Sequence, residues 1–336
     1  MKLVPRKPFN LHLTLRPSFI SSLFCHKGCS WTKVAGFYKG LKLAQVGDEV
    51  VVEYKGHLDL DYVKKLIGVH RGPFEEKIDK LEEEVREIAE ALALEYPGVR
   101  IPIDQEDFVF IFISVVLSRR ADYERFVLRW CMRIWKLVQE NPFKLLAYDE
   151  EELRHNIGTS YQIVHAKEAL NDLRKLLLDL GVSSDDVYRI GPALAEVGLA
   201  ELRRLLISKC SWIGPKVADS IILTSYGDVY TPPCDVHLIT VSRRLGVVPE
   251  DARPPNVTYC AKYICSKCPI TDHCVRSLIV RRFKDLAAWY QTLAYLHARK
   301  YCRTYKPLCQ RCPLRAVCEK NNLKSETADQ VLRGRA

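Results

Sequence analysis

The sequence lacks the long apolar segments and the repeats that mark several classes of protein. Its most apolar run, Phe108 to Leu117, has ten residues, whereas a helix that spans a bilayer needs about 20. The first residues contain no apolar block of the kind found in a secretory signal. No repeat of about 20 to 50 residues spans the chain. We therefore expect no membrane span, no repeat architecture and a cytoplasmic location.

Acidic residues are outnumbered by basic ones. Lys and Arg total 51 against 41 Asp and Glu, which gives a formal charge of +10 and a pI of about 8.9. Hydrophobic residues (48%) and charged residues (27%) are in the range of ordinary globular proteins. At 336 residues the chain is long enough for about two domains. The excess of positive charge favours a polyanionic partner, with nucleic acid as the first choice.

The patterning changes from strand-like to helical near residue 60. From Phe9 to Tyr54 apolar and polar residues alternate between turn signals, which predicts a small antiparallel β region. An amphipathic stretch then runs from Phe74 to Leu94, and a helix that starts at Asp107 is apolar on all sides and hence buried. Further helices are expected at 121–138, 150–156, 164–179, 193–207, 216–224, 236–244 and 277–301.

These patterns predict a mainly α (α+β) protein. We expect an N-terminal antiparallel β domain (1–60), a helical domain (61–255), an inserted four-cysteine loop (256–276), a closing helix with a metal loop (277–322) and a flexible tail (323–336).

A short break separates two helical segments near residue 213. An amphipathic helix from Leu202 to Ile207 is followed by Ser211-Trp212-Ile213-Gly214-Pro215, and helical periodicity resumes at Lys216. Glycine permits a tight turn, and proline suits the first position of a helix. Exposed backbone N–H groups at such a turn bind phosphate. The segment therefore predicts a helix-hairpin-helix that contacts DNA through Trp212, Ile213, Gly214 and Pro215.

Two motifs carry a resemblance to a known family. Ile213-Gly214-Pro215-Lys216-Val217-Ala218-Asp219, followed by Cys234-Asp235-Val236-His237, resembles the catalytic segment of the helix-hairpin-helix DNA glycosylases, endonuclease III among them. The N-terminal strands are more similar to those of the 8-oxoguanine and alkyladenine glycosylases. The resemblance implies that Lys216 is a nucleophile and Asp235 an essential carboxylate, that His237 contacts DNA, and that the partner is duplex DNA with a damaged base or abasic site, bound by a nucleoid-associated monomer.

Elementary chemistry supports both catalytic roles. A lysine in the first turn of a helix, partly buried, has a lowered pKa, which leaves the neutral amine able to attack C1′ of a deoxyribose. A nearby carboxylate stabilises the positive charge that develops on the sugar when the base leaves. Two simpler alternatives stay open: the lysine contacts a phosphate, and Asp235 only caps a helix.

The chain departs from the family at three places. Trp212 stands where the hairpin commonly has its first glycine. Arg119 and Arg120 stand where relatives have the glutamine or asparagine that fills the gap left by the extruded base. Three alternatives stay open for each arginine: it fills this gap, it holds a phosphate, or it is an ordinary surface residue. Ser18 falls near the place where 8-oxoguanine enzymes use a glycine backbone to sense the oxidised base, so the resemblance does not support that specificity. The sequence does not select which damaged base is removed.

Eight of the 13 cysteines lie in two quartets near the C-terminus. Cys302, Cys309, Cys312 and Cys318 have the spacing C-x6-C-x2-C-x5-C, which matches the [4Fe-4S] loop of endonuclease III relatives. The inserted quartet, Cys260, Cys265, Cys268 and Cys274, shares the core C-x2-C-P-x4-C and is expected to bind a second [4Fe-4S] cluster or a zinc ion. Cys25, His26 and Cys29 form a weaker group that we interpret as incidental.

Basic residues are frequent in the segment that leads into the C-terminal cysteine loop. Between residues 276 and 311 nine Lys or Arg accompany one acid, Asp285, which predicts a phosphate-binding face.

Taken together, the motifs and the resemblance predict a base-excision DNA glycosylase with abasic-site lyase activity. The alternatives are a monofunctional glycosylase and a non-catalytic iron-sulfur DNA-binding protein.

Overall fold

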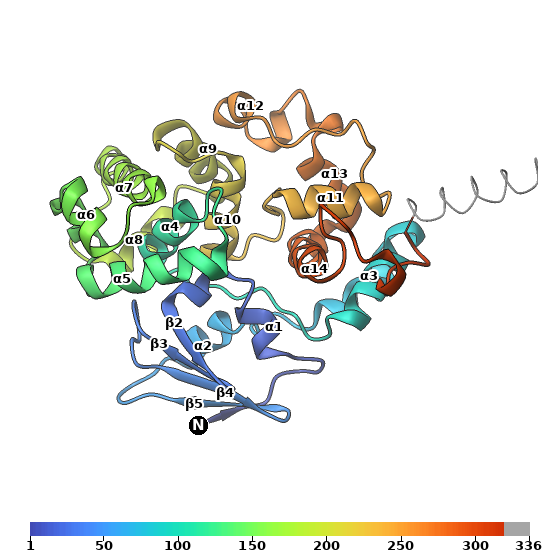
Figure 1. The fold of residues 1–336 in the computed structure, drawn as a ribbon, viewed down its shortest axis with the longest axis horizontal. Helices are drawn as coiled ribbons and strands as arrows, with labels where there is room; N and C mark the ends of the chain where they lie inside the picture. Colours follow the sequence, from blue (N-terminus) through green and yellow to red (C-terminus); the bar gives the residue numbers. More distant parts are fainter. Residues whose placement is uncertain (319–336) are drawn as a thin grey trace, which may run out of the picture.

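The computed structural model describes residues 1–318 and begins with the predicted antiparallel sheet (Figure 1). Trp31, Leu43, Val50 and Val52 on one face of the sheet are buried, as the alternation of apolar residues predicts. The strands follow the order β1-β5-β4-β3-β2 and are β1 (Lys2–Leu3), β2 (Phe24–Lys27), β3 (Ser30–Lys33), β4 (Lys42–Val46) and β5 (Glu49–Glu53).

One part of the predicted β region is wrong. Residues 9–15 alternate in polarity, yet Leu11–Leu15 forms the short helix α1. The Asn10 side chain accepts a hydrogen bond from the Leu13 N–H and caps this helix. Leu11 and Leu15 are both buried, so a single helical turn and a strand bury the same two positions here and the pattern does not distinguish them.

A first hydrophobic core joins the sheet to most of the helices. Its centre is α4 (Phe108–Leu117), all of whose residues are buried, as predicted. The expected helix at 193–207 is two helices, because Gly198 adopts a left-handed φ of 85° between them. The surrounding helices are α2 (Leu60–Leu66), α5 (Leu128–Val138), α6 (Glu150–Asn156), α7 (Tyr161–Asp179), α8 (Val187–Ala195), α9 (Leu199–Lys209), α10 (Pro215–Tyr226) and α12 (Val257–Lys262).

A second core is built around α14 and contains the buried rings of Trp289 and Tyr290. The expected helix at 74–94 is a 3-10 segment, Phe74–Lys80, followed by α3 (Glu83–Glu95), because Leu81 is extended and inserts into this core. The expected helix at 277–301 is likewise α13 (Val275–Phe283) and α14 (Ala287–Lys300), separated at Lys284 with φ 51°. The core is completed by α11 (Val236–Arg244).

The two cores place their helices on opposite sides of the molecule. Figure 1 shows α4 to α10 on one side, with α11, α13, α14 and α3 on the other and the sheet below the first group. Residues 227–235 connect α10 to α11 and thus join the two sides. No helix among residues 1–318 is long and apolar enough to cross a membrane. The predicted tail at 323–336 lies outside the described residues.

Candidate active site

The predicted hairpin is present between α9 and α10. Pro215 is the first residue of α10, and Gly214 caps it. Ile213 is buried, so only its backbone can contact a ligand. The left-handed residue of the turn is Trp212, with φ 66°, and Gly214 has an ordinary φ of −91°. The expectation that Gly214 supplies the tight turn is therefore wrong.

Contacts of the indole explain how a tryptophan occupies a backbone conformation that L-residues rarely adopt. Its ring stacks on His165 with centroids 3.6 Å apart and planes inclined by 12°. The indole N–H donates to Glu168 Oε2 at 2.5 Å, and the Arg119 guanidinium lies 5.1 Å from the ring centroid. These contacts of the indole stabilise the left-handed backbone conformation that a glycine would adopt without strain.

Lys216 is the second residue of α10 and is half-buried at the positive end of this helix. Nζ donates to Ser118 Oγ at 3.3 Å and lies 5.3 Å from the centroid of the Phe19 ring. It forms no ion pair within residues 1–318. Burial lowers the pKa of the Lys216 ammonium, and the nearby negative charge of Asp235 opposes part of this effect.

Asp235 caps α11, as the sequence predicts. Its Oδ1 accepts a hydrogen bond from the Leu238 N–H at 2.8 Å. Within residues 1–318, Oδ2 accepts no hydrogen bond. The carboxylate therefore has one oxygen committed to the helix and one available to a ligand.

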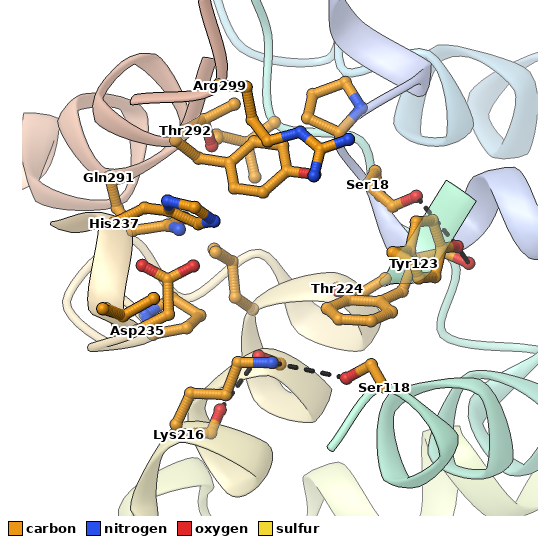
Figure 2. A pocket seen from close by; sticks show the side chains of 18 of the residues that line it. Ser18, Ser118, Tyr123, Lys216, Thr224, Asp235, His237, Gln291, Thr292 and Arg299 are labelled. Atoms are coloured by element: carbon orange, nitrogen blue, oxygen red, sulfur yellow. Dashed lines mark hydrogen bonds between the residues drawn. The ribbon is translucent and has the colours of Figure 1, made fainter. Parts of the chain in front are cut away.

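The two predicted catalytic side chains reach the same cavity of about 560 Å³. Figure 2 shows Lys216 rising from α10 and Asp235 entering from the start of α11, with Arg299 above them. The walls come from both sides of the molecule and from the segment that contains Ser18 and Phe19. A cavity of this size accommodates one nucleotide base and its sugar.

The structure separates the two arginines of the loop after α4. Arg119 is half-buried, hydrogen-bonds His165 Nδ1 at 3.2 Å and lies over Trp212. Arg120 is exposed at the cavity with φ 52° and has no hydrogen bond or ion pair with any of residues 1–318. Arg120 is therefore the arginine that is available to DNA.

Three residues on α14 line the cavity and were not singled out from the sequence: Gln291, Thr292 and Tyr295. Gln291 and Tyr295 lie one helical turn apart and line the cavity, and Figure 2 shows Gln291 beside His237. The Tyr295 ring makes an edge contact with the His237 ring at 5.4 Å. The available signal was a single amide, Gln291, within the apolar helix 287–298. Such a polar interruption is too common to identify a site alone.

The predicted basic face is largely neutralised. Five of the nine basic residues pair with acids elsewhere in the chain: Arg276 with Asp219, Arg281 with Asp272, Arg282 with Glu84, Arg299 with Asp122 and Lys300 with Glu95. Counting charges within residues 276–311 did not include these acids, because most of them are distant in sequence. Lys284, Arg303, Lys306 and Arg311 are exposed and unpaired within residues 1–318.

The C-terminal quartet surrounds one cavity of about 180 Å³, lined by Cys302, Cys309, Cys312 and Cys318. His297 Nε2 lies 3.3 Å from Cys312 Sγ, and Arg244 Nη1 donates to Cys302 Sγ at 3.4 Å. Within residues 1–318, no three His, Cys, Asp or Glu side chains converge closely enough to hold a single metal ion. Metal binding by either quartet thus stays a prediction.

The inserted quartet follows α12. Arg276 Nη1 donates to Cys265 Sγ at 2.6 Å, and Arg203 Nη2 lies 3.7 Å from Cys260 Sγ. In the N-terminal region, His26 packs on the Trp31 ring at 4.2 Å. Its neighbours Cys25 and Cys29 form no disulfide within residues 1–318, and the interpretation of this group as incidental stays a prediction.

Comparison with known proteins defines the fold. No family model and no curated protein matches the sequence. The 8-oxoguanine glycosylase/lyase of Clostridium acetobutylicum, solved with double-stranded DNA containing cytosine opposite 8-oxoG, superposes with a TM-score of 0.65 at 15% identity over 87% of this chain and 92% of that one. The 3-methyladenine DNA glycosylase of Archaeoglobus fulgidus gives 0.61 at 14% identity over 89% and 99%. An endonuclease III in a non-covalent DNA complex gives 0.50 at 19% identity over 73% and 98%. The chain therefore has the fold of the helix-hairpin-helix DNA glycosylases.

Proposed function

We propose that this protein is a DNA base-excision glycosylase with abasic-site lyase activity. The observation that carries the proposal is the convergence of Lys216 and Asp235 on one cavity, with Lys216 free of any ion pair within residues 1–318. Proteins of the same fold include one solved as a glycosylase/lyase with DNA. Duplex DNA with a damaged base or an abasic site is the proposed partner, bound by a monomer.

Lys216 is the proposed nucleophile. Burial and the helix N-terminus both favour its neutral amine. The Nζ lone pair forms a bond to C1′ while the glycosidic bond breaks, and the base leaves with the bonding electrons and takes up a proton. Opening of the sugar ring gives an imine, and loss of a proton from C2′ then expels the 3′ phosphate by β-elimination. Ser118 Oγ, which accepts from Nζ, orients the amine.

Asp235 is the proposed electrostatic stabiliser. Charge develops on the sugar as the base departs, and a carboxylate already fixed in place stabilises it without reorganisation. The helix cap holds Oδ1 in position, so that Oδ2 can face the sugar. Capping and catalysis are thus compatible roles of one side chain.

DNA contacts come from three loops around the cavity. The backbone of Trp212 to Pro215 at the start of α10 would bind a phosphate. Arg120 would fill the space that the extruded nucleotide leaves in the duplex. His237 would contact the DNA beside the cavity.

The C-terminal quartet is the proposed site of a [4Fe-4S] cluster. Four cysteines around one cavity supply the thiolates that such a cluster requires. When bound, the cluster would hold the loop from residue 302 to 318 against α14 and Arg244. For the inserted quartet we propose a second metal centre, either a [4Fe-4S] cluster or zinc.

A panel of duplexes, each with one lesion, tests the proposal. We expect the protein to release at least one damaged base and to nick the strand, and Lys216→Ala to abolish nicking. Lys209→Ala, which changes an exposed lysine of α9, serves as the control and should act like wild type. If Lys216→Ala still releases the base at full rate, the protein is a monofunctional glycosylase. If the wild type processes no lesion, the non-catalytic DNA-binding alternative holds.

A further inference from the structure

A buried ion-pair network lies directly behind Lys216. Asp219, three residues further along α10, is fully buried and accepts from Arg203 Nε at 2.5 Å. Arg276 Nε lies 3.4 Å from the same carboxylate oxygen. Both guanidinium groups are themselves buried, with 3% and 6% of each residue exposed. These three residues belong to three different helices, α9, α10 and α13, and no sequence motif connects them.

The charges of this network do not balance. Two guanidinium groups and one carboxylate leave one positive charge uncompensated, and burial of an unpaired charge is costly. The remaining N–H groups are directed at sulfur: Arg276 donates to Cys265 at 2.6 Å and Arg203 approaches Cys260 to 3.7 Å. A zinc ion or a [4Fe-4S] core with four thiolates carries a net charge of about −2. Such a centre at the inserted quartet would supply the missing negative charge.

Arg276 also contacts the chain that leads to the second catalytic residue. Its Nη2 donates to the Tyr230 carbonyl at 2.9 Å. Tyr230 lies in the segment between α10 and α11, five residues before Asp235. One side chain thus contacts α10 through Asp219, the segment before Asp235 through its backbone, and the inserted quartet through Cys265.

We propose that Arg276 is a positioning residue that makes the spacing between Lys216 and Asp235 depend on a metal centre at the inserted quartet. This inference rests on the second metal centre of the proposed function. The centre fixes the guanidinium from one side, and the guanidinium fixes α10 and the 227–235 segment from the other. Displacement of a catalytic group by about 1 Å can cost about 100-fold in rate, so this link controls catalysis from outside the cavity.

The first test replaces Arg276 by methionine, which keeps the length and removes the charge and all three contacts. Arg189→Met, at an arginine paired with Asp186 on the surface, is the matched control. Three quantities are measured: the metal retained after exposure to a chelator, the rate of borohydride trapping on DNA that still carries the damaged base, which requires both Lys216 and Asp235, and the affinity for that DNA. We expect Arg276→Met to lose metal from the inserted quartet at least 10-fold faster and to trap at least 10-fold more slowly, with affinity within about twofold. The control should match wild type in all three.

The second test asks whether metal and arginine act through one link. Cys268→Ser removes a proposed ligand of the inserted quartet, and no hydrogen bond joins Cys268 to α10 in the described chain. We expect Cys268→Ser to slow trapping as Arg276→Met does, and the double variant to be no slower than the worse single variant, because residues of one network are not additive. Arg276→Lys keeps the charge and should be intermediate in metal retention. It also provides a folded comparison if the methionine variant is unstable.

Each contrary result overturns the inference. Unchanged metal retention in Arg276→Met shows that the arginine does not support the centre. Loss of metal with unchanged trapping shows that the centre does not position the catalytic residues. Multiplicative effects in the double variant show two independent contributions. If the wild type itself never traps DNA, the proposed function fails, and metal retention alone then decides whether Arg276 supports the centre.

Discussion

Replacement of Asp235 by asparagine separates catalysis from helix capping. Asparagine caps a helix as well as aspartate does, so the Oδ1 contact with the Leu238 N–H should persist and the melting temperature should shift by less than about 2 °C. Loss of the charge removes an electrostatic stabiliser, which typically costs about 100- to 1,000-fold, or about 3–4 kcal/mol of transition-state stabilisation. Single-turnover base release on the preferred lesion duplex measures this cost.

Asp235→Asn should slow base release but should not slow the attack of Lys216 on an abasic site. Asp235 raises the pKa of Lys216 against the lowering by burial. Without the carboxylate, the pKa falls further and more of the amine is neutral near pH 7. Trapping on a preformed abasic site, where no base must leave, should therefore be retained or faster.

Two further variants separate the effect of the charge from the effect of the helix cap. Asp186→Asn alters the cap of α8, away from the cavity, and should leave both reactions unchanged. Asp235→Ala should add a loss of about 1 kcal/mol in stability from the missing cap. Full base release by Asp235→Asn, or a loss of base release only in proportion to lost folded protein, would contradict a catalytic role of the Asp235 charge.

Three further predictions follow from the site. Because burial lowers the pKa of Lys216 below its ordinary 10.5, the trapping rate on abasic DNA should rise with pH and level off below pH 10.5; a rate that falls as pH rises would contradict a neutral nucleophile. Arg120→Ala should weaken binding to lesion duplexes more than to undamaged DNA, and equal losses by titration would make Arg120 a phosphate contact. Protein purified without oxygen should contain about eight irons if both quartets hold clusters, or about four irons and one zinc if the inserted quartet binds zinc. Cys312→Ser should remove about four irons. Colourless protein with only zinc would rule out both clusters.

The sequence predicted the parts of the fold that depend on local chemistry. Pro215 after a glycine marked the start of α10, and the apolar run from Phe108 marked a buried helix. The sequence placed Lys216 and Asp235 as candidates, and both line one cavity. These features follow from backbone preferences and hydrophobic periodicity over a few residues.

Features set by tertiary contacts were beyond the sequence. The stack of Trp212 on His165 permits a left-handed backbone conformation at Trp212, which local backbone preferences alone would predict only for a glycine. Acids far along the chain neutralise the basic face, as Glu95 does for Lys300. Gln291 joins the cavity because α14 packs opposite α10, and no short-range signal gives that arrangement.

The central claim is that Lys216 forms the covalent bond to DNA. Borohydride reduction of the wild-type protein with abasic or lesion DNA, followed by proteolysis and mass spectrometry of the cross-linked peptide, tests it most directly. We expect a single modified peptide, with the deoxyribose remnant on Lys216 Nζ. A stable adduct on any other residue, or strand cleavage without an adduct, would contradict it.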